Sequence, residues 1–271
     1  MISFPNCKIN LGLNVLRKRS DGYHDIESVF YPVELNDALE VVRNDPFAFT
    51  SSGLGIPGDP SQNLCVKAYE MIVRNYSIPS VRIHLLKNIP MGGGLGGGSS
   101  NGAFTLKLLN DFFELNITEE QLLGMALELG SDCPFFIKNK PQLALGRGEI
   151  LSEVELSLKG KHLVLVNDGI HISTAQAFAS IKPSVPQENI SDIILKPPVF
   201  WKSRLKNDFE PGIFSLFPQL SRLKDLLYDS GALYASMTGT GSTVYGIFDK
   251  FPELPERIMD SSGFVRIIEL N

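Results

Sequence analysis

Apolar and polar residues alternate near the N-terminus. Apolar side chains occupy every second position from Ile9 to Val15, and polar or small residues fill the positions between them. This period of two predicts a strand on which Lys8 and Asn10 share one face. A turn follows at 20–22, and a second apolar run continues to Phe30.

Along the rest of the chain, segments with the apolar period of a helix alternate with segments that have the pattern of a strand. Apolar residues recur every three or four positions over 63–74, 103–113 and 220–227, which predicts helices. Alternation over 81–85 and apolar runs over 163–166 and 244–248 predict strands. Thr118 and Gln121 form a capping-box pair, and Gly130 suits the end of the helix that they begin. The four prolines of 182–198 predict a segment that is largely loop.

This mixture of elements predicts an α+β fold in two lobes. A length of 271 residues allows one large domain or two ordinary ones. We expect an N-terminal domain over 1–150 and a C-terminal domain over 151–271. The hydrophobic fraction of 43% and the charged fraction of 20% are typical of a globular protein with a sizeable core.

Charge and cysteine content narrow the partners. The net charge of −5 gives no overall positive field for nucleic acid or anionic lipid, so we expect neither nucleic acid nor a membrane as a partner. The first residues have no basic head or long apolar centre, which predicts no secretory signal. Three widely spaced cysteines argue against a disulfide scaffold and favour the cytoplasm. We expect a monomer or a weak homodimer.

The most informative stretch runs from Pro90 to Ser100, where six of seven consecutive residues are glycine. Glycines are costly to order, but they allow close backbone approach to a ligand, with several N–H groups facing one anion. The predicted helix directly after them points its positive dipole end the same way. Ser99 and Ser100 could cap that helix, or reach phosphate oxygens and a bound Mg²⁺. A plain flexible loop is the less favoured reading, because linkers usually fall between domains.

Three other phosphate-binding loops compete for this stretch. The Walker A loop needs a lysine after the glycines, and none follows. The protein-kinase loop needs H-R-D and D-F-G segments, which the chain lacks. A Rossmann G-x-G-x-x-G matches at Gly92, Gly94 and Gly97, with Asp111 near the position of a ribose-binding acid. It ranks second, since such loops usually follow a first strand.

The glycine run resembles the P-x-x-x-G-L-G-S-S-A-A loop of the GHMP kinase superfamily. Lys8-Ile9-Asn10-Leu11 is similar to the N-terminal motif of that family, and 238–242 is similar to its C-terminal glycine motif. The resemblance implies ATP as phosphoryl donor, with Mg²⁺ bound along with the nucleotide. It also implies a two-lobed GHMP kinase fold, with an N-terminal ATP-binding α/β lobe and a C-terminal ferredoxin-like α+β lobe. The ATP-binding residues that it implies are Asn63, Pro90, Met91, Gly92, Gly93, Gly94, Leu95, Gly96, Gly97, Gly98, Ser99 and Ser100.

Within the superfamily, the segments 21–24 and 130–134 resemble the 4-diphosphocytidyl-2-C-methyl-D-erythritol kinase family of the non-mevalonate route to isoprenoid precursors. Asn101 departs from the usual alanine after the loop serines, and Ser131 and Cys133 also depart from the common pattern. None of these changes removes a functional group. The resemblance implies transfer of the ATP γ-phosphoryl group to the 2-hydroxyl of a substrate that carries cytidine diphosphate.

The resemblance assigns catalysis to Lys8 and Asp132. From the residues alone, a helix-cap role is favoured for Asp132 and a surface role for Lys8. In the family the aspartate is the base, and the lysine holds it ionised and orients the hydroxyl. We expect no metal site made by the protein itself, because the histidines lack ligand spacing.

The resemblance also implies a cytidine site. Tyr23 would stack on cytosine, His24 would read its edge, and Phe178 would close the other side, which are roles that suit these side chains. Buried structural roles are the ordinary alternative for Tyr23 and His24. The full set of expected substrate-binding residues is Asn10, Tyr23, His24, Thr174, Phe178, Gly239, Thr240 and Gly241. A homoserine or mevalonate-type kinase and a catalytically silent binding protein remain alternatives.

Overall fold

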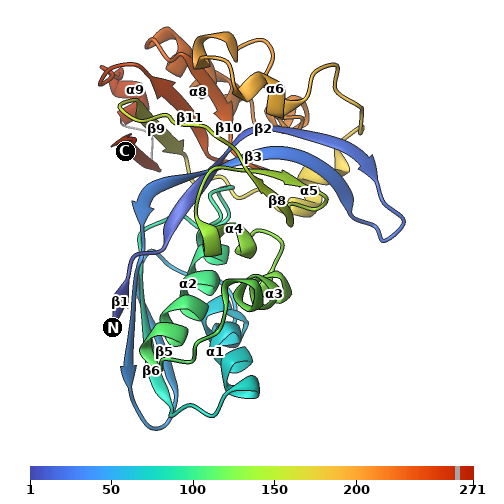
Figure 1. Cartoon of the computed structure of the whole chain (residues 1–271). Helices are drawn as coiled ribbons and strands as arrows, with labels where there is room; N and C mark the ends of the chain where they lie inside the picture. Colours follow the sequence, from blue (N-terminus) through green and yellow to red (C-terminus); the bar gives the residue numbers. More distant parts are fainter. Residues whose placement is uncertain (260–262) are drawn as a thin grey trace. The chain divides into compact units, whose positions relative to one another are not determined.

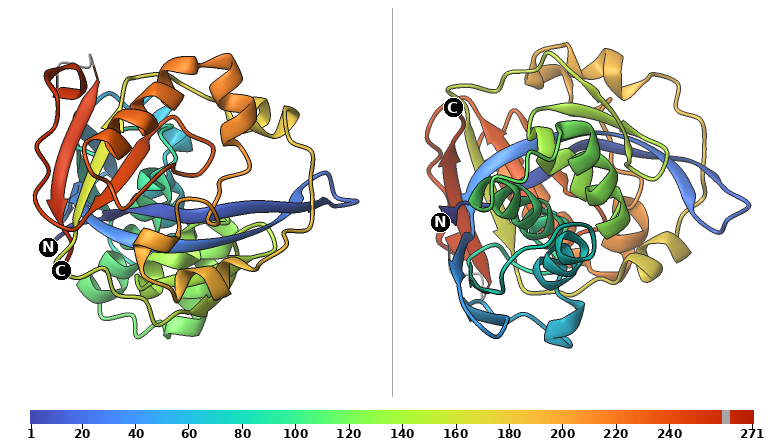
Figure 2. Two further views of the ribbon diagram at one scale, coloured as in Figure 1. Left: turned by 90° about the horizontal axis from the view of Figure 1, so that it is seen from above. Right: turned by 60° about the horizontal axis from the view of Figure 1, so that its bottom comes forward.

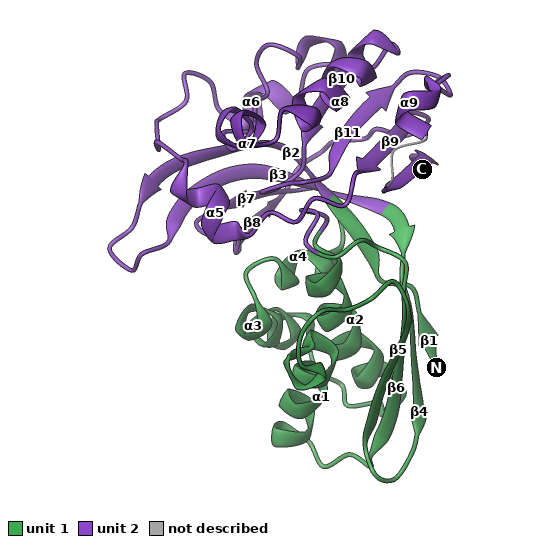
Figure 3. Ribbon diagram, turned by 180° about the vertical axis from the view of Figure 1, so that it is seen from behind, with its two compact units in different colours: residues 1–8, 34–91, 96–140 green, residues 9–33, 92–95, 141–271 purple. Residues whose placement is uncertain are grey.

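The structure is a computed structural model that describes residues 1–259 and 263–271. The chain forms two compact units, shown in green and purple in Figure 3. Unit 1 comprises residues 1–8, 34–91 and 96–140, and unit 2 comprises 9–33, 92–95 and 141–271. The chain therefore enters each unit more than once, and the glycine run contributes to both.

Unit 1 is a sheet covered on one face by helices (Figures 1 and 3). The strand order is β1-β4-β6-β5, in which β5 is parallel to β6 and the other pairs are antiparallel. The strands are β1 (Ile2–Ser3), β4 (Ala38–Arg43), β5 (Ala48–Gly53) and β6 (Val81–Lys87). The helices are the 3₁₀ turn η1 (Pro60–Gln62), α1 (Leu64–Asn75), α2 (Gly97–Phe112), α3 (Glu119–Leu129) and α4 (Cys133–Lys138).

The first sheet of unit 2 is built on a long hairpin. Its order is β2-β3-β7-β8. The strands are β2 (Asn6–Lys18), β3 (His24–Asn36), β7 (Gln142–Leu145) and β8 (Ile150–Glu153). The hairpin is formed by β2 and β3, and the first three residues of β2 and the last three of β3 belong to unit 1. In Figure 2 the turn of the β2–β3 hairpin, in blue, reaches beyond the rest of unit 2.

The second sheet of unit 2 has the ferredoxin-like arrangement. It is antiparallel with the order β10-β11-β9-β12, and helices precede β10 and β12 in the chain, which gives the β-α-β-β-α-β pattern. The strands are β9 (His162–Asn167), β10 (Tyr234–Met237), β11 (Val244–Phe248) and β12 (Phe264–Glu269). The helices are α5 (Thr174–Ala179), α6 (Ile190–Ile194), η2 (Pro198–Phe200), α7 (Glu210–Leu216), α8 (Pro218–Asp229) and α9 (Glu256–Met259).

The core of unit 2 joins this sheet to the hairpin and to α7 and α8. Leu13 and Val15 of β2 pack with Val164 of β9, Val244 of β11 and Leu227 of α8, and all five are buried. One apolar cluster thus holds N-terminal and C-terminal segments together, which fixes the hairpin that carries the Asp21–His24 segment.

Most of the predicted elements are confirmed. The structure has the strands expected over 8–15, 81–85, 163–166 and 244–248, and the helices expected over 63–74, 103–113 and 220–227. The Thr118–Gln121 capping box forms, and Gly130 follows the end of that helix. The α+β fold class is confirmed too. The domain boundary near residue 150 stays a prediction.

One local alternative, a serine cap on the helix after the glycine run, was wrong. The helix after the glycine run begins at Gly97, so Ser99 and Ser100 lie inside its first turn and the N-cap is Gly96. Gly96 has φ +68, a left-handed conformation that favours glycine, and no side chain makes a capping hydrogen bond, so the serines do not cap the helix. The segment 182–198 is largely loop, as predicted, and it contains the short helix α6, in which Ile190, Ile193 and Ile194 are buried. Burial of apolar side chains stabilises this short helix in a proline-rich segment.

Within residues 1–259 and 263–271, none of the helices has the length and apolar character needed to span a bilayer.

Candidate active site

Lys8 and Asp132 form an ion pair in unit 1. Lys8 Nζ lies 3.4 Å from Asp132 Oδ2, and the two side chains are 4% and 34% exposed. Lys8 comes from β2, and Asp132 immediately precedes α4. The Asp132 carboxylate is thus paired with a buried ammonium and remains partly exposed. The structure therefore brings together the two residues expected to be catalytic.

Asp132 occupies the N-cap position of α4, but its side chain makes no capping hydrogen bond. The carboxylate is thus directed to Lys8 and not to the helix, which removes the main reason for the cap interpretation. The neighbouring Cys133 is buried, and this burial raises the pKa of its thiol to about 12. A thiol that stays protonated at neutral pH is not a nucleophile.

The second half of the glycine run lies next to Lys8 in unit 1. A Cβ atom on Gly96 would come within 3.1 Å of Lys8 Cε and Cγ, which is a tight contact, and φ +68 at this position also favours glycine. The residues that follow open α2 with free backbone N–H groups, as an anion site requires. Ser99 is partly exposed, whereas Ser100 is buried and its hydroxyl has no hydrogen-bond partner among the described residues.

The first half of the run packs on the C-terminal glycine motif in unit 2. A Cβ atom on Gly94 would lie 2.0 Å from the Thr238 carbonyl oxygen, and Gly94 has φ +76. Thr238 Oγ1 donates to the Gly94 carbonyl at 3.1 Å, and Thr243 N donates to the Gly93 carbonyl at 3.3 Å. Gly239 and Gly241 also have positive φ, so this contact joins two segments that only glycine can form. Thr240 lies between them and is partly buried.

Asn10 is buried and forms hydrogen bonds within unit 2. Its backbone N–H donates to Thr238 Oγ1 at 3.0 Å, and its side-chain amide donates to Ser28 Oγ at 2.9 Å. Thr238 Oγ1 in turn lies 3.2 Å from Asn10 Oδ1, and the Tyr245 hydroxyl donates to the Asn10 carbonyl at 2.7 Å. Asn10 thus holds β2 against the 238–241 segment, and the first half of the glycine run packs on the same segment.

A cavity of about 230 Å³ opens in unit 1 at the start of α1. Met91, Gly98 and Asn101 from the glycine run and α2 form one part of its lining. Asn63, which is also the N-cap of α1 and accepts from Cys65 N at 2.9 Å, lies on another part. The further lining residues are Phe49, Ser51, Ile56, Pro57, Gly58, Asp59, Pro60, Gln62 and Leu64. The cavity is largely apolar, carries a few polar groups and lies beside the glycine run, and such a cavity suits a flat heterocycle.

Of the expected cytidine-site residues, His24 and Phe178 are in contact in unit 2. His24 and Phe178 stack, with ring centres 4.6 Å apart and an interplanar angle of 20°. Tyr23 precedes His24 at the start of β3 and is 56% exposed, and Thr174 is an exposed residue at the start of α5. Burial, followed by the charge of Lys18, lowers the pKa of His24, so its imidazole is neutral at pH 7.

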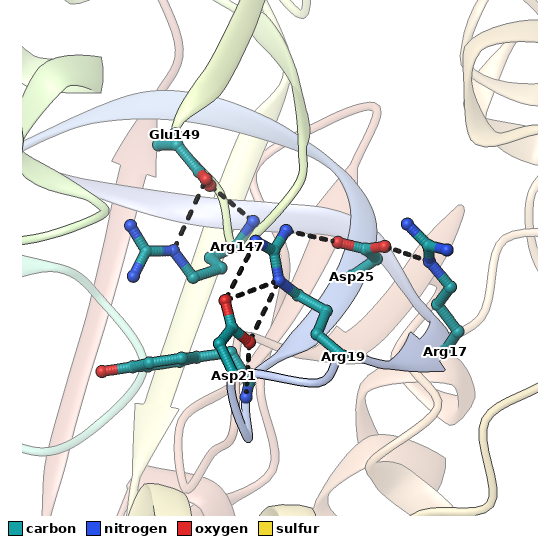
Figure 4. A network of polar contacts seen from close by, with 7 residues as sticks. Arg17, Arg19, Asp21, Asp25, Arg147 and Glu149 are labelled. Carbon is teal, nitrogen blue, oxygen red and sulfur yellow. Dashed lines mark hydrogen bonds and ion pairs between the residues drawn. The ribbon is translucent and has the colours of Figure 1, made fainter.

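Sequence reasoning missed several residues around these sites. Arg147 lies over the Tyr23 ring, in a network of arginines and carboxylates shown in Figure 4. In unit 1, the buried pair Lys87–Asp37 lies under α2, where a Cβ on Gly97 would come within 3.0 Å of Lys87 Nζ. The sequence offered one signal for this pair, a lysine at the end of an apolar strand. The cavity wall around Phe49 and Ile56 carried no pattern in the sequence.

No cluster of three or more histidine, cysteine, aspartate or glutamate side chains suited to a metal ion occurs in the part of the chain that the structure describes.

Comparison with known proteins places the chain in a family. The family model described as GHMP kinases N terminal domain matches residues 63–140, and the one described as GHMP kinases C terminal matches residues 198–257. A relative from Parabacteroides distasonis, named 4-diphosphocytidyl-2-C-methyl-D-erythritol kinase, is 47% identical over 265 residues, or 98% of each chain. This chain belongs to the 4-diphosphocytidyl-2-C-methyl-D-erythritol kinase family of GHMP kinases. The family is one of ATP-dependent phosphotransferases, so the chain is an ATP-dependent kinase.

Other members agree with this placement. A kinase of the same name from Bacteroides fragilis is 51% identical over 252 residues, covering 92% of each chain. A crystal structure of 4-(cytidine 5'-diphospho)-2C-methyl-D-erythritol kinase superposes with a TM-score of 0.84 at 28% identity, covering 99% of this chain and 98% of that one. A homoserine kinase from Cytophaga hutchinsonii superposes with a TM-score of 0.65 at 15% identity, covering 98% of this chain and 95% of that one. That last likeness concerns the fold alone.

Proposed function

We propose that this kinase transfers the γ-phosphoryl group of ATP to the 2-hydroxyl of 4-diphosphocytidyl-2-C-methyl-D-erythritol, in the non-mevalonate route to isoprenoid precursors. The observation that carries the proposal is the 47–51% identity, over nearly the whole chain, to kinases named for this substrate. The aromatic residues at Tyr23, His24 and Phe178 support a base in the acceptor, since homoserine and mevalonate offer none to stack.

The glycine run is the proposed phosphate site. Backbone N–H groups at the start of α2, together with its positive dipole end, would hold the ATP phosphates. The cavity lined by Asn63 and Met91 would take the adenine, at the end of the glycine run where the base of the nucleotide must lie. Asn63 Oδ1 already caps α1, so its side-chain amide is the group available to the ligand.

Asp132 and Lys8 are the proposed catalytic residues. The Asp132 carboxylate accepts the proton of the attacking hydroxyl, which is the acid–base step that phosphoryl transfer to an alcohol requires. The Lys8 ammonium, 3.4 Å away, keeps that carboxylate ionised and can donate to the reacting oxygen. A side chain at position 96 would crowd the Lys8 stem, so Gly96 leaves space for the lysine beside the phosphate loop.

Mg²⁺ would arrive with the nucleotide and neutralise charge on the transferring phosphoryl group. The residues present fit this role: Ser99 and Asp132 are both partly exposed in unit 1, and Mg²⁺ commonly takes only one or two ligands from the protein. Dependence of activity on added Mg²⁺ tests this part of the proposal.

The cytidine site would use the side chains gathered in unit 2. Tyr23 would stack on the ring, neutral His24 would present one donor and one acceptor to its edge, and Phe178 would close the site. Gly239, Gly241 and Thr240 offer backbone and hydroxyl groups for the remaining polar part of the acceptor, with Asn10 holding their segment and Thr174 at the start of α5. A cytoplasmic location, and a monomer or weak homodimer, stay predictions.

An ADP-release assay with Mg-ATP tests the proposal against its rivals. The acceptor panel contains the cytidyl diphosphate substrate, homoserine, mevalonate, phosphomevalonate and galactose. We expect turnover with the first alone. Turnover with homoserine or a mevalonate-type acid would indicate another GHMP activity, and ATP binding without ADP release from any acceptor would indicate a silent binding protein.

A further inference from the structure

The Tyr23 ring is exposed, yet it is held from one side. Tyr23 is 56% exposed, and the guanidinium carbon of Arg147 lies 4.9 Å from the ring centre. Arg147 sits in the turn between β7 and β8, between Gly146 and Gly148, both with positive φ. An arginine over an aromatic face gains from cation–π attraction and from stacking of its planar group.

Arg147 is itself fixed by its own turn. Glu149 accepts a hydrogen bond from the Arg147 backbone N–H and another, at 3.5 Å, from Arg147 Nε. The Gly146 carbonyl accepts from Ile26 N at 2.7 Å, so the turn is attached to β3 three residues after Tyr23. A Cβ on Gly146 would come within 2.9 Å of the Glu149 carboxylate, which is a reason for glycine there. Glu149 therefore contacts Arg147 at both its backbone N–H and its guanidinium group.

A second set of charges, around Asp21 and Arg19 (Figure 4), holds the backbone of Tyr23. Asp21 Oδ1 accepts from Tyr23 N at 3.1 Å, and Arg19 Nε contacts both oxygens of Asp21 at 3.2 and 3.0 Å. Arg19 also donates to Asp25 at 2.9 Å, and Arg17 donates to the other oxygen of Asp25. Hydrogen bonds from Arg19, foremost among several causes, hold the pKa of Asp21 below its ordinary value, so this carboxylate stays charged at neutral pH.

We propose that Arg147 is a positioning residue for the acceptor: it covers one face of the Tyr23 ring and holds that ring ready, so that the cytosine stacks on the opposite face. This inference rests on the proposed function, because it assumes that Tyr23 binds cytosine. An exposed tyrosine ordinarily samples several rotamers, and a ligand that stacks on it must stop that motion. Here Arg147 fixes the ring and Asp21 fixes the backbone before the ligand arrives.

The expected kinetic signature is a change in acceptor binding alone. Arg147→Ala leaves the Tyr23 ring free to rotate, so that the acceptor must order the ring when it binds. The free-energy cost of ordering one side chain corresponds to about a three- to ten-fold rise in KM for the cytidyl acceptor. The value of kcat and the KM for ATP should stay unchanged, since the contacts of Arg147 are with Tyr23 and Glu149. Arg147→Lys keeps a cation over the ring and should recover part of the loss, and Arg147→Met keeps the aliphatic stem without the charge.

Two comparisons separate this role from a general structural one. Arg266→Ala removes a similar pair, in which the guanidinium carbon lies 4.3 Å from the Phe264 ring centre, and it should leave all constants unchanged. In the double variant Arg147→Ala/Tyr23→Leu, the acceptor KM should equal that of Tyr23→Leu alone, because Arg147 acts through the ring. Melting temperatures of all variants, measured alongside, identify any loss of folding.

The outcomes distinguish the inference from the function beneath it. If Tyr23→Leu raises the acceptor KM but neither Arg147→Ala nor Arg147→Met does, the inference is overturned and the cytosine site stands. If Arg147→Ala raises KM by the same factor with and without Tyr23, the arginine contacts the acceptor directly and the positioning role is wrong. If Tyr23→Leu itself leaves the acceptor KM unchanged, the cytosine site proposed above is wrong, and the inference fails with it.

Discussion

Removal of the Asp37 carboxylate should destabilise unit 1 severely, because the group lies at the centre of a buried network. Its side chain and that of Lys87 are both 0% exposed and form an ion pair. Asp37 also accepts from Asn88 N at 2.7 Å, Ile89 N at 2.9 Å and Asn101 Nδ2 at 2.8 Å. In the Asp37→Ala variant, a buried ammonium loses its counter-charge, which costs about 3–5 kcal/mol of unfolding free energy.

The pH dependence of this loss identifies its cause. Burial lowers the pKa of Lys87, and Asp37 opposes that shift, so removing Asp37 lets the pKa of the folded lysine fall further. Between that value and the unfolded value of about 10.4, the unfolded state binds the additional proton. The stability of the variant must therefore rise with pH over this window, and more steeply than in the wild type.

Urea unfolding at pH 7 and pH 9.5 measures both effects. The control is Asp249→Ala, which removes a partner of Lys161 that is 61% exposed and 2.6 Å away. It should leave the unfolding midpoint unchanged, as is common for exposed pairs. The double variant Asp37→Ala/Lys87→Met should recover the part of the loss that comes from the stranded ammonium. An Asp37→Ala midpoint as high as that of the control, or a deficit equal at both pH values, would refute the reasoning.

Three further predictions concern single groups. Asp132→Asn should lower kcat by a factor on the order of 10²–10⁴, as expected for losing a general base, with ATP affinity preserved in a calorimetric titration; an unchanged kcat would remove Asp132 from the mechanism. The KM for the cytidyl acceptor should rise as pH falls below about 6.5, because His24, whose pKa is lowered, stays neutral until then and loses its acceptor nitrogen on protonation. The same rise in His24→Gln would contradict this assignment. Cys7, Cys65 and Cys133 are buried with pKa values raised to about 12, so iodoacetamide at pH 8 should modify none of them until urea unfolds the protein; rapid labelling of the native protein would show that the thiols are accessible.

The fold was predictable where the hydrophobic pattern was strong. The alternation from Ile9 to Val15 and the helical period of 103–113 both correspond to observed elements, because burial on one face decides such segments. The start of α2 was misplaced since a glycine can adopt both helical and left-handed conformations. Gly96 and Gly97 therefore look alike in sequence although one precedes the helix and the other begins it.

The candidate site was predictable only as far as its motifs reached. Lys8 and Asp132 are 124 positions apart in sequence, and only resemblance to a family paired them before the structure did. No motif pointed to Arg147, which meets Tyr23 through the pairing of β3 with β7 and the turn after it. Contacts of this kind depend on tertiary structure, and a local pattern contains no trace of them.

The position of the new phosphate on the product tests the proposed function most directly. Carbon 2 of the acceptor bears the methyl group, so its hydroxyl is tertiary and the carbon carries no hydrogen. After incubation with Mg-ATP and 4-diphosphocytidyl-2-C-methyl-D-erythritol, the proton-coupled ³¹P spectrum should show one new phosphomonoester signal without three-bond splitting from a carbinol proton. A split phosphomonoester signal would place the phosphate on another hydroxyl, and the absence of any new phosphomonoester while ATP remains would contradict the proposed reaction.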